Sequence, residues 1–221
     1  MPTSLTRRGF RVPPDAPRPV ISVVTYGVGN VGSIFNMFRK IGVAAVAAST
    51  PDEVARAEKI LLPGVGSFDH GMEMLERAGL GPSLKARVAD GAPLLGICLG
   101  MQLLGIGSEE GQRPGLGLLD AHSVRFQGNG DPTFRVPHMG WNELVQRRAS
   151  PLFAGFEERA RFYFVHSYHL VCVDPSDVLA TARYGGDFTA IVQRGNVWGA
   201  QFHPEKSHRF GMTLLANFAN L

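Results

Sequence analysis

The chain has 221 residues, of which 44% are hydrophobic and 19% are charged, a balance typical of one globular domain with a sizeable core. Its two cysteines exclude a disulfide framework and favour a reducing, cytoplasmic compartment. No apolar run approaches the ~18 residues that a membrane span requires, and the formal net charge is only +3. The sequence therefore predicts neither a membrane nor a nucleic-acid partner.

The formal positive charge lies in the first 19 residues. This segment contains four arginines and one aspartate, so the remaining body is formally neutral, and it is also rich in proline. A segment of this composition buries too little apolar surface to fold by itself. We therefore predict a disordered basic leader over 1–19 and a single domain over 20–221. A targeting or RNA-binding role for the leader is the alternative.

The first hundred residues alternate short apolar runs with segments of helical periodicity. The apolar runs predict strands at 20–26, 43–48, 59–62 and 93–97. The intervening segments predict helices at 34–41, from 50, from 68 to about 79, and from 82 to about 91. The second of these begins with a capping box from Thr50 to Glu53. Strands that alternate with helices form a parallel sheet covered on both faces, with its chemistry at the carboxyl ends of the strands.

The stretch around Cys98 carries most of the functional argument. Cys98 stands between a predicted strand and a helical segment, with Gly96 and Gly100 two residues away on either side. This is the pattern of a nucleophile elbow, in which small neighbours let a tight turn lift the nucleophile above the sheet. A helix N-terminus also favours the thiolate, the form that attacks carbonyl carbon atoms. The alternative is a buried cysteine that packs as a small hydrophobic residue.

The second half of the chain is rich in predicted strands. They lie at 121–126, 142–145, 161–165, 168–173, 178–184, 188–193 and 197–202, separated by turn residues. Phe210, Leu214, Leu215 and Phe218 then recur at helical spacing and predict a closing helix. These strands predict antiparallel additions to the sheet.

A thiolate nucleophile needs a base, and the base needs a group that orients it. The tripeptide at 203–205 places the carboxylate of Glu205 two residues beyond the imidazole of His203. Proline favours extended backbone before it, and residues i and i+2 of an extended chain project to one face. We therefore predict that Cys98, His203 and Glu205 form a catalytic set, with His166 and His169 as alternative bases. The Cys/His spacing fits no metal site, so no metal is expected.

The attack of a thiolate on a carbonyl group also needs donors for the oxyanion that develops. The backbone N–H of Leu99, directly after the nucleophile, is one candidate. The glycine-rich loop 64–66 follows a neighbouring strand and offers the other at Val65, because glycine lets a backbone approach a substrate closely. The alternative for this loop is an ordinary strand-to-helix turn.

Together these motifs resemble a known family. The sequence GICLGMQ at 96–102 with HPE at 203–205 resembles the class I, triad-type glutamine amidotransferases. Further motifs are similar to those of the HisH family, the glutaminase subunits of imidazole glycerol phosphate synthase. They are YGVGN at 26–30, LPGVGSF at 62–68, PHMGWN at 137–142, YFVHSY at 163–168 and QFHPEKS at 201–207. The resemblance covers about residue 20 to the C-terminus. It implies an α/β, flavodoxin-like fold with a central, mostly parallel sheet, helices on both faces and antiparallel β additions in the second half.

The resemblance implies a glutaminase of histidine biosynthesis that needs no cofactor. Cys98 would attack the side-chain amide of L-glutamine and form a glutamyl thioester and ammonia, with His203 moving protons and Glu205 orienting it. Water would then release glutamate. The residues implied to hold glutamine are Gly66, Gln102, Glu110, Ser167 and Tyr168.

The resemblance also implies a heterodimer with the cyclase subunit, a (β/α)8 barrel that receives the ammonia. Binding of this partner and its ligand would raise the glutaminase activity, which is coupling between two sites. The positions implied to lie near the interface are Tyr26, Asn30, His138, Trp141 and Lys206. Tyr26 and Trp141 have the alternative of being core aromatic residues.

Three other functions compete with this interpretation. The first is a class I glutaminase that serves pyridoxal phosphate, anthranilate or guanylate synthesis, against which the PHMGWN and YFVHSYH motifs argue. The second is a stand-alone cysteine hydrolase, such as a γ-glutamyl hydrolase, which would work without a partner. The third is a non-catalytic binding module that has kept the fold, against which the intact set of Cys98, His203 and Glu205 argues.

Overall fold

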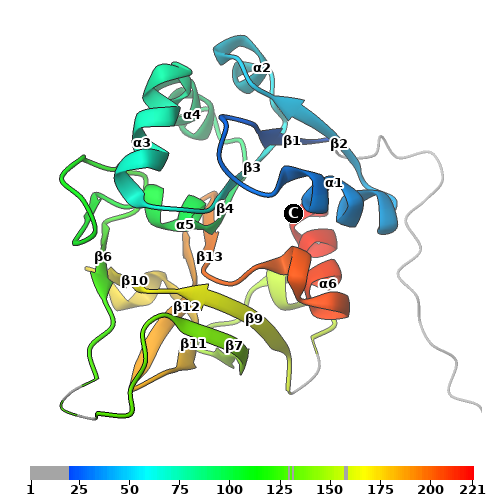
Figure 1. The fold of residues 1–221 in the computed structure, drawn as a ribbon. Coiled ribbons are helices and arrows are strands. Elements are labelled where there is room, and N and C mark those ends of the chain that lie inside the picture. The colour runs from blue at the N-terminus through cyan, green and yellow to red at the C-terminus, as the bar shows by residue number, and fades with distance from the viewer. Residues whose placement is uncertain (1–19, 129, 131, 157–158) are drawn as a thin grey trace, which may run out of the picture.

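The computed structural model describes residues 20–128, 130, 132–156 and 159–221, so the predicted leader 1–19 lies outside the described residues. Eight strands in this part of the chain form the central sheet (Figure 1). In spatial order they are β2 (Ala44–Ala48), β1 (Val20–Val24), β3 (Lys59–Gly64), β4 (Leu94–Cys98), β13 (Val197–Ala200), β12 (Asp187–Arg194), β11 (Val178–Arg183) and β8 (Val145–Gln146). The first five are parallel and the last three are antiparallel additions. The predicted sheet architecture is therefore confirmed.

Several strands between residues 107 and 172 do not join the central sheet. β6 (Ala121–Arg125) lies between the antiparallel β10 (Tyr168–Cys172) and the parallel β5 (Gly107–Ser108). β7 (His138–Glu143) pairs with β9 (Arg161–His166) in a separate two-stranded sheet. β10 contacts β12, and β7 contacts β11, so the small sheets lie beside the antiparallel half of the central sheet (Figure 1). The sequence predicts most of these strands but not this separate pairing, because alternation along one strand does not specify its partner.

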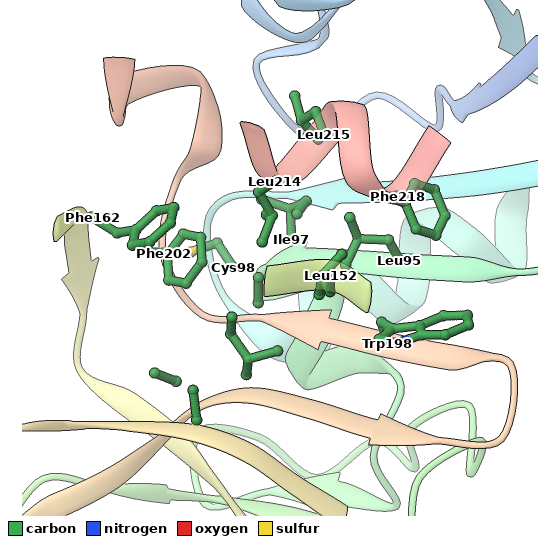
Figure 2. Close-up of a cluster of buried hydrophobic side chains, with 14 of the residues drawn as sticks. Leu95, Ile97, Cys98, Leu152, Phe162, Trp198, Phe202, Leu214, Leu215 and Phe218 are labelled. Carbon is green, nitrogen blue, oxygen red and sulfur yellow. The ribbon is translucent and has the colours of Figure 1, made fainter. Parts of the chain in front are cut away.

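Helices cover both faces of the central sheet. One face carries α1 (Val31–Lys40) and α6 (His208–Ala219), and the other carries α2 (Pro51–Ala55), α3 (Phe68–Arg77), α4 (Leu80–Ala89) and α5 (Leu99–Leu103). Alternate residues of β4 supply the two cores: Leu95 and Ile97 pack on the α6 side, whereas Leu94 packs on the opposite side. Figure 2 shows Leu95 and Ile97 next to α6. None of the helices formed by the described residues has the length and apolarity that a membrane crossing requires.

The boundaries of the elements differ from the predictions where distant segments pair. The capping box is confirmed, since the Glu53 N–H donates to Thr50 Oγ1 at 3.3 Å and the Thr50 N–H donates to Glu53 Oε2 at 3.0 Å. In contrast, β3 runs two residues further than predicted, to Gly64, which pairs with Cys98. This longer strand carries the 64–66 loop to the level of the nucleophile elbow.

Candidate active site

The backbone at Cys98 has the strained geometry of a nucleophile elbow. Cys98 ends β4 and precedes α5, with φ 54° and ψ −114°, a conformation that non-glycine residues rarely adopt. A Cβ atom on Gly100 would lie 2.0 Å from the carbonyl oxygen of Leu62, and one on Gly96 would lie 2.7 Å from the carbonyl oxygen of Gly100. Only glycine fits at either position without a backbone shift, so the two glycines let α5 start directly against β3 and β4. The turn presents the sulfur at the carboxyl end of β4.

His203 and Glu205 lie beside this elbow. His203 follows β13, which pairs directly with β4, and its ring is almost fully buried. Its Nδ1 lies 2.8 Å from Glu205 Oε1, and the ring borders the same pocket as Cys98. The predicted contact between His203 and Glu205 is present, but its cause differs from the predicted one. The backbone turns into a single 3-10 turn, η3 (Pro204–Lys206), directly after His203 and does not continue as an extended strand.

A buried hydroxyl holds the turn around His203 in place. Ser207 Oγ donates to the carbonyl oxygen of His203 at 2.6 Å and accepts from the N–H of Tyr163 at 3.0 Å. The His203 N–H donates to the carbonyl oxygen of Tyr163 at 2.9 Å. These three bonds tie the loop after β13 to β9, so the backbone that carries the imidazole is fixed relative to β9.

The pKa of His203 is strongly raised. Burial by itself would lower the pKa, but the hydrogen bonds to Cys98 and Glu205, together with the negative charges of both, raise it to about 10. At neutral pH the arrangement therefore favours the imidazolium form of His203. A protonated imidazole beside a cysteine is the usual means of activating a thiol as a nucleophile.

A cavity of about 420 Å³ opens over Cys98 and His203. Every residue that the sequence predicted for the oxyanion hole and for glutamine lines it: Val65, Gly66, Leu99, Gln102, Glu110, Ser167 and Tyr168. These residues come from the loop after β3, from α5, from the segment after β5 and from the β9–β10 junction. Segments that are up to about a hundred residues apart in the chain thus converge on one pocket of the size that small ligands occupy.

Two polar side chains of the cavity are held by hydrogen bonds inside the protein. Glu110 Oε2 accepts from the N–H of Phe68, the first residue of α3, at 2.8 Å. Gln102 Nε2 donates to the carbonyl oxygen of Tyr168 at 3.0 Å and to Gln201 Oε1 at 3.1 Å. Both N–H bonds of Gln102 are therefore used, and its Oε1 is the atom left for a ligand.

The alternative bases His166 and His169 do not have the environment of a base at neutral pH. Burial lowers the pKa of His166 to about 3, and it also lowers the pKa of His169. Both ring nitrogens of His166 are occupied, Nδ1 by the carbonyl oxygen of Tyr168 at 2.8 Å and Nε2 by His138 Nδ1 at 3.1 Å. Although several histidines gather here, the described residues contain no group of three or more His, Cys, Asp or Glu side chains placed to hold a metal ion.

The five residues predicted near the partner interface fall into two groups. Asn30, Trp141 and Lys206 are exposed, with Trp141 46% accessible. Tyr26 and His138 are buried, so their side chains do not present a surface to a partner. Tyr26 donates its hydroxyl to the carbonyl oxygen of Pro63 at 2.8 Å, and burial, followed by the charge of Cys98, raises its pKa. The alternative of a core aromatic residue therefore describes Tyr26, whereas Trp141 is on the surface.

Two features of the site were missed by the sequence analysis. Gln201 is completely buried directly after β13, with its amide nitrogen 3.9 Å from Cys98 Sγ. His138 is the hydrogen-bond partner of His166 across the β7–β9 sheet. A polar residue inside an apolar run was the available signal for Gln201. No local pattern indicates the contact between His138 and His166, which are 28 residues apart.

Known proteins share this sequence and fold. The family model "Glutamine amidotransferase class-I" matches residues 22–220. Imidazole glycerol phosphate synthase subunit HisH 2 of Pseudomonas aeruginosa is 49% identical over 203 residues, which cover 91% of this chain and 100% of that protein. Subunit HisH of Bdellovibrio bacteriovorus is 46% identical, with coverages of 91% and 100%. Among solved structures, PurLQS from Thermotoga maritima has a TM-score of 0.71 at 21% identity, covering 92% of this chain and 98% of that one, which shows a shared fold.

The family match and the elbow site together define the class of protein: the chain belongs to the class I glutamine amidotransferases. Within this class the high identity over the full length of the relatives narrows the assignment. The chain is a member of the HisH family of imidazole glycerol phosphate synthase subunits.

Proposed function

We propose that this chain is the glutaminase subunit of an imidazole glycerol phosphate synthase, with Cys98, His203 and Glu205 as its catalytic triad. The observation that carries the triad is the placement of Cys98 next to a buried His203–Glu205 pair. Cys98 and His203 line the same cavity, and His203 Nδ1 lies 2.8 Å from Glu205 Oε1. The strained turn at Cys98 and the buried turn at His203 hold the two reacting groups in fixed positions.

In the proposed reaction, the Cys98 thiolate attacks the side-chain amide carbon of L-glutamine. The oxygen becomes an oxyanion, which the N–H groups of Leu99 and Val65 stabilise. The His203 imidazolium gives its proton to the amide nitrogen, the C–N bond breaks, and ammonia leaves a glutamyl thioester. Water then attacks the thioester while His203 takes its proton, and the C–S bond breaks to release glutamate and restore the thiolate. Glu205 keeps the imidazole oriented throughout.

The cavity offers complementary groups for the α-amino acid end of glutamine. One carboxylate oxygen of Glu110 accepts a hydrogen bond from the Phe68 N–H. We assign its other oxygen to the α-ammonium group of glutamine. Gln102 Oε1 is a second acceptor for the ligand, because its amide nitrogen is already bonded. Gly66, Ser167 and Tyr168 supply backbone groups around the substrate. These assignments place the charged α-amino acid end of glutamine away from Cys98 Sγ and its side-chain amide next to Cys98 Sγ.

We further propose that the partner is the cyclase subunit, which receives the ammonia. A candidate docking surface lies on β7 and on η3. Met139 and Trp141 share one face of β7 and are 62% and 46% exposed. Trp141 stacks on His208 at 5.4 Å between ring centroids, and Lys206 lies over the ring of Tyr163. Lys206 also lines the cavity, so a partner bound here would lie at its rim. With both cysteines free, we place the complex in the cytoplasm.

The test is ammonia release from glutamine by the chain alone and by the chain mixed with the cyclase and the cyclase's nucleotide ligand. We expect weak activity alone, a large rise in the mixture, and none from Cys98→Ala in either sample. Full activity of the chain alone would indicate a stand-alone hydrolase. Stimulation by a different synthase subunit, but not by the cyclase, would refute the proposed partner while leaving the triad intact.

A further inference from the structure

Gln201 is a polar side chain that is fully buried in the domain. It follows the last residue of β13 and is 0% exposed, between the buried Ala200 and Phe202. A buried amide group is costly unless its N–H and C=O groups are hydrogen-bonded. The partners of Gln201 therefore show which interactions keep it there.

The orientation of the Gln201 amide follows from a backbone carbonyl group. The carbonyl oxygen of Tyr168 can only accept, so the Gln102 atom 3.0 Å from it must be the nitrogen. The second N–H of that nitrogen then points to Gln201 and needs an acceptor, which makes the Gln201 atom at 3.1 Å the oxygen. The Gln201 nitrogen is consequently the atom next to Cys98 Sγ, at 3.9 Å. The donor and acceptor roles of its partners thus fix the orientation of the Gln201 amide group.

The carbonyl oxygen of Tyr168 also accepts a hydrogen bond from His166. His166 Nδ1 donates to the same Tyr168 oxygen at 2.8 Å, which leaves His166 Nε2 as an acceptor for the N–H of His138 Nδ1. The directions of all the hydrogen bonds from His138 to Gln201 are therefore consistent with one another. Such a network gives Gln201 one preferred rotamer and one preferred amide orientation.

We infer that Gln201 is a further residue of the glutaminase machinery, whose side-chain N–H donates to Cys98 Sγ and stabilises the thiolate. This inference rests on the proposed role of Cys98 as the nucleophile. Among the described residues, Cys98 Sγ is the acceptor found for the Gln201 nitrogen. A neutral thiol is a weak acceptor, whereas a thiolate is a charged one, and hydrogen bonds to charged groups are the stronger. The bond therefore favours the thiolate both before attack and when sulfur leaves the thioester.

The test measures the reactivity of Cys98 without using glutamine. The probe is iodoacetamide, applied over a range of pH in a Cys172→Ala background so that Cys98 is the one thiol left. Gln201→Met keeps the length of the side chain but removes the donor. Gln193→Met is the matched control, because Gln193 lies on β12 and donates to the carbonyl oxygen of Gly195 away from the site.

We expect Gln201→Met to move the half-maximal rate of alkylation to higher pH by about one unit, as loss of a charged hydrogen bond implies. At pH values below the half-maximal point its rate should fall by about threefold to tenfold, because the loss of thiolate is partly offset by the greater nucleophilicity of a more basic thiolate. Gln193→Met should match the parent. Identical profiles for Gln201→Met and the parent would overturn the inference.

A second variant, Gln201→Asn, and separate assays of the proposed function distinguish misfolding from a true lack of effect. If Gln201→Met does not fold, Gln201→Asn keeps an amide at the position but shortens its reach to the sulfur, and the same direction of change is expected. An unchanged profile in a folded Gln201→Asn would then count against the inference. Rapid alkylation of the parent and ammonia release from glutamine test the proposed function separately. A reactive Cys98 that is indifferent to Gln201 would refute only the role of Gln201.

Discussion

The buried histidine pair behind the cavity makes the stability of the fold depend on pH in a predictable direction. Burial lowers the pKa of His166 to about 3 and that of His138 to about 4. In the unfolded chain a histidine has a pKa of about 6.5. Between these values the unfolded state binds a proton that the native state does not, so stability is fully present above pH 6.5 and is lost as pH falls.

The magnitude follows from the distance between the working pH and the unfolded pKa. At pH 5 the unfolded His166 is one and a half units below its pKa, and each unit corresponds to about 1.4 kcal/mol, which gives a loss of about 2 kcal/mol. This figure requires only that the native pKa lies well below 5, as it does for a ring with both nitrogens occupied. His138 contributes a loss of the same sign.

The assay is urea unfolding followed by circular dichroism at pH 7.5 and pH 5.0. His166→Gln keeps a donor for the Tyr168 carbonyl group and removes the titrating ring. We expect the parent to lose about 2 kcal/mol more than this variant between the two pH values. His70→Gln, at an exposed position on α3, is the control and should keep the dependence of the parent. Equal pH dependence in the parent and His166→Gln would refute the argument.

Three further substitutions and one control variant test other parts of the argument. Glu205→Gln should lower kcat/KM for glutamine by about tenfold to hundredfold, which is the value of a charged hydrogen bond to His203. Because Glu205 raises the pKa of His203, the same change should move the alkaline limb of the pH–rate profile to lower pH. Gly100→Ala should lower the free energy of unfolding by about 3 kcal/mol or more, because its Cβ would lie 2.0 Å from a carbonyl oxygen of β3. Gly32→Ala, in open space on α1, should instead be neutral or stabilise by up to about 1 kcal/mol. Trp141→Ala should weaken stimulation by the cyclase at least tenfold with little change in the melting temperature, since this exposed ring is proposed to lie in the interface. Unchanged stimulation would remove β7 from the docking surface.

The candidate site could be proposed from the sequence because its main signals are local. Gly96 and Gly100 bracket Cys98, and the collisions that any Cβ would make at both glycines explain why this spacing marks an elbow. His203 and Glu205 are only two residues apart, so their contact does not depend on the rest of the fold. His203 itself has the extended backbone that was predicted (φ −100°, ψ 99°), but the 3-10 turn η3 starts at the next residue, so the extended chain does not continue to Glu205.

Partners that are distant in the chain could not be predicted in the same way. The hydrogen bond between His138 and His166 depends on the register of β7 against β9, and the sequence does not specify which strands pair. The burial of Tyr26 was likewise undecided, because an aromatic residue after a strand is compatible with both a core and an interface. For Gln201, the sequence shows a polar residue in an apolar run but not the sulfur that its nitrogen meets.

The sequence by itself determined the alternation of strands and helices, the mostly parallel sheet, the elbow at Cys98 and the family of the chain. These depend on periodicity, glycine spacing and short motifs, which are properties of neighbouring residues. Only the tertiary structure decided that four strands of the second half form separate small sheets, that His138 and Tyr26 are buried, and that Gln201 and His166 support the cavity. The reason is physical: burial and hydrogen-bond partners depend on which distant segments meet, and that is decided by the packing of the whole chain.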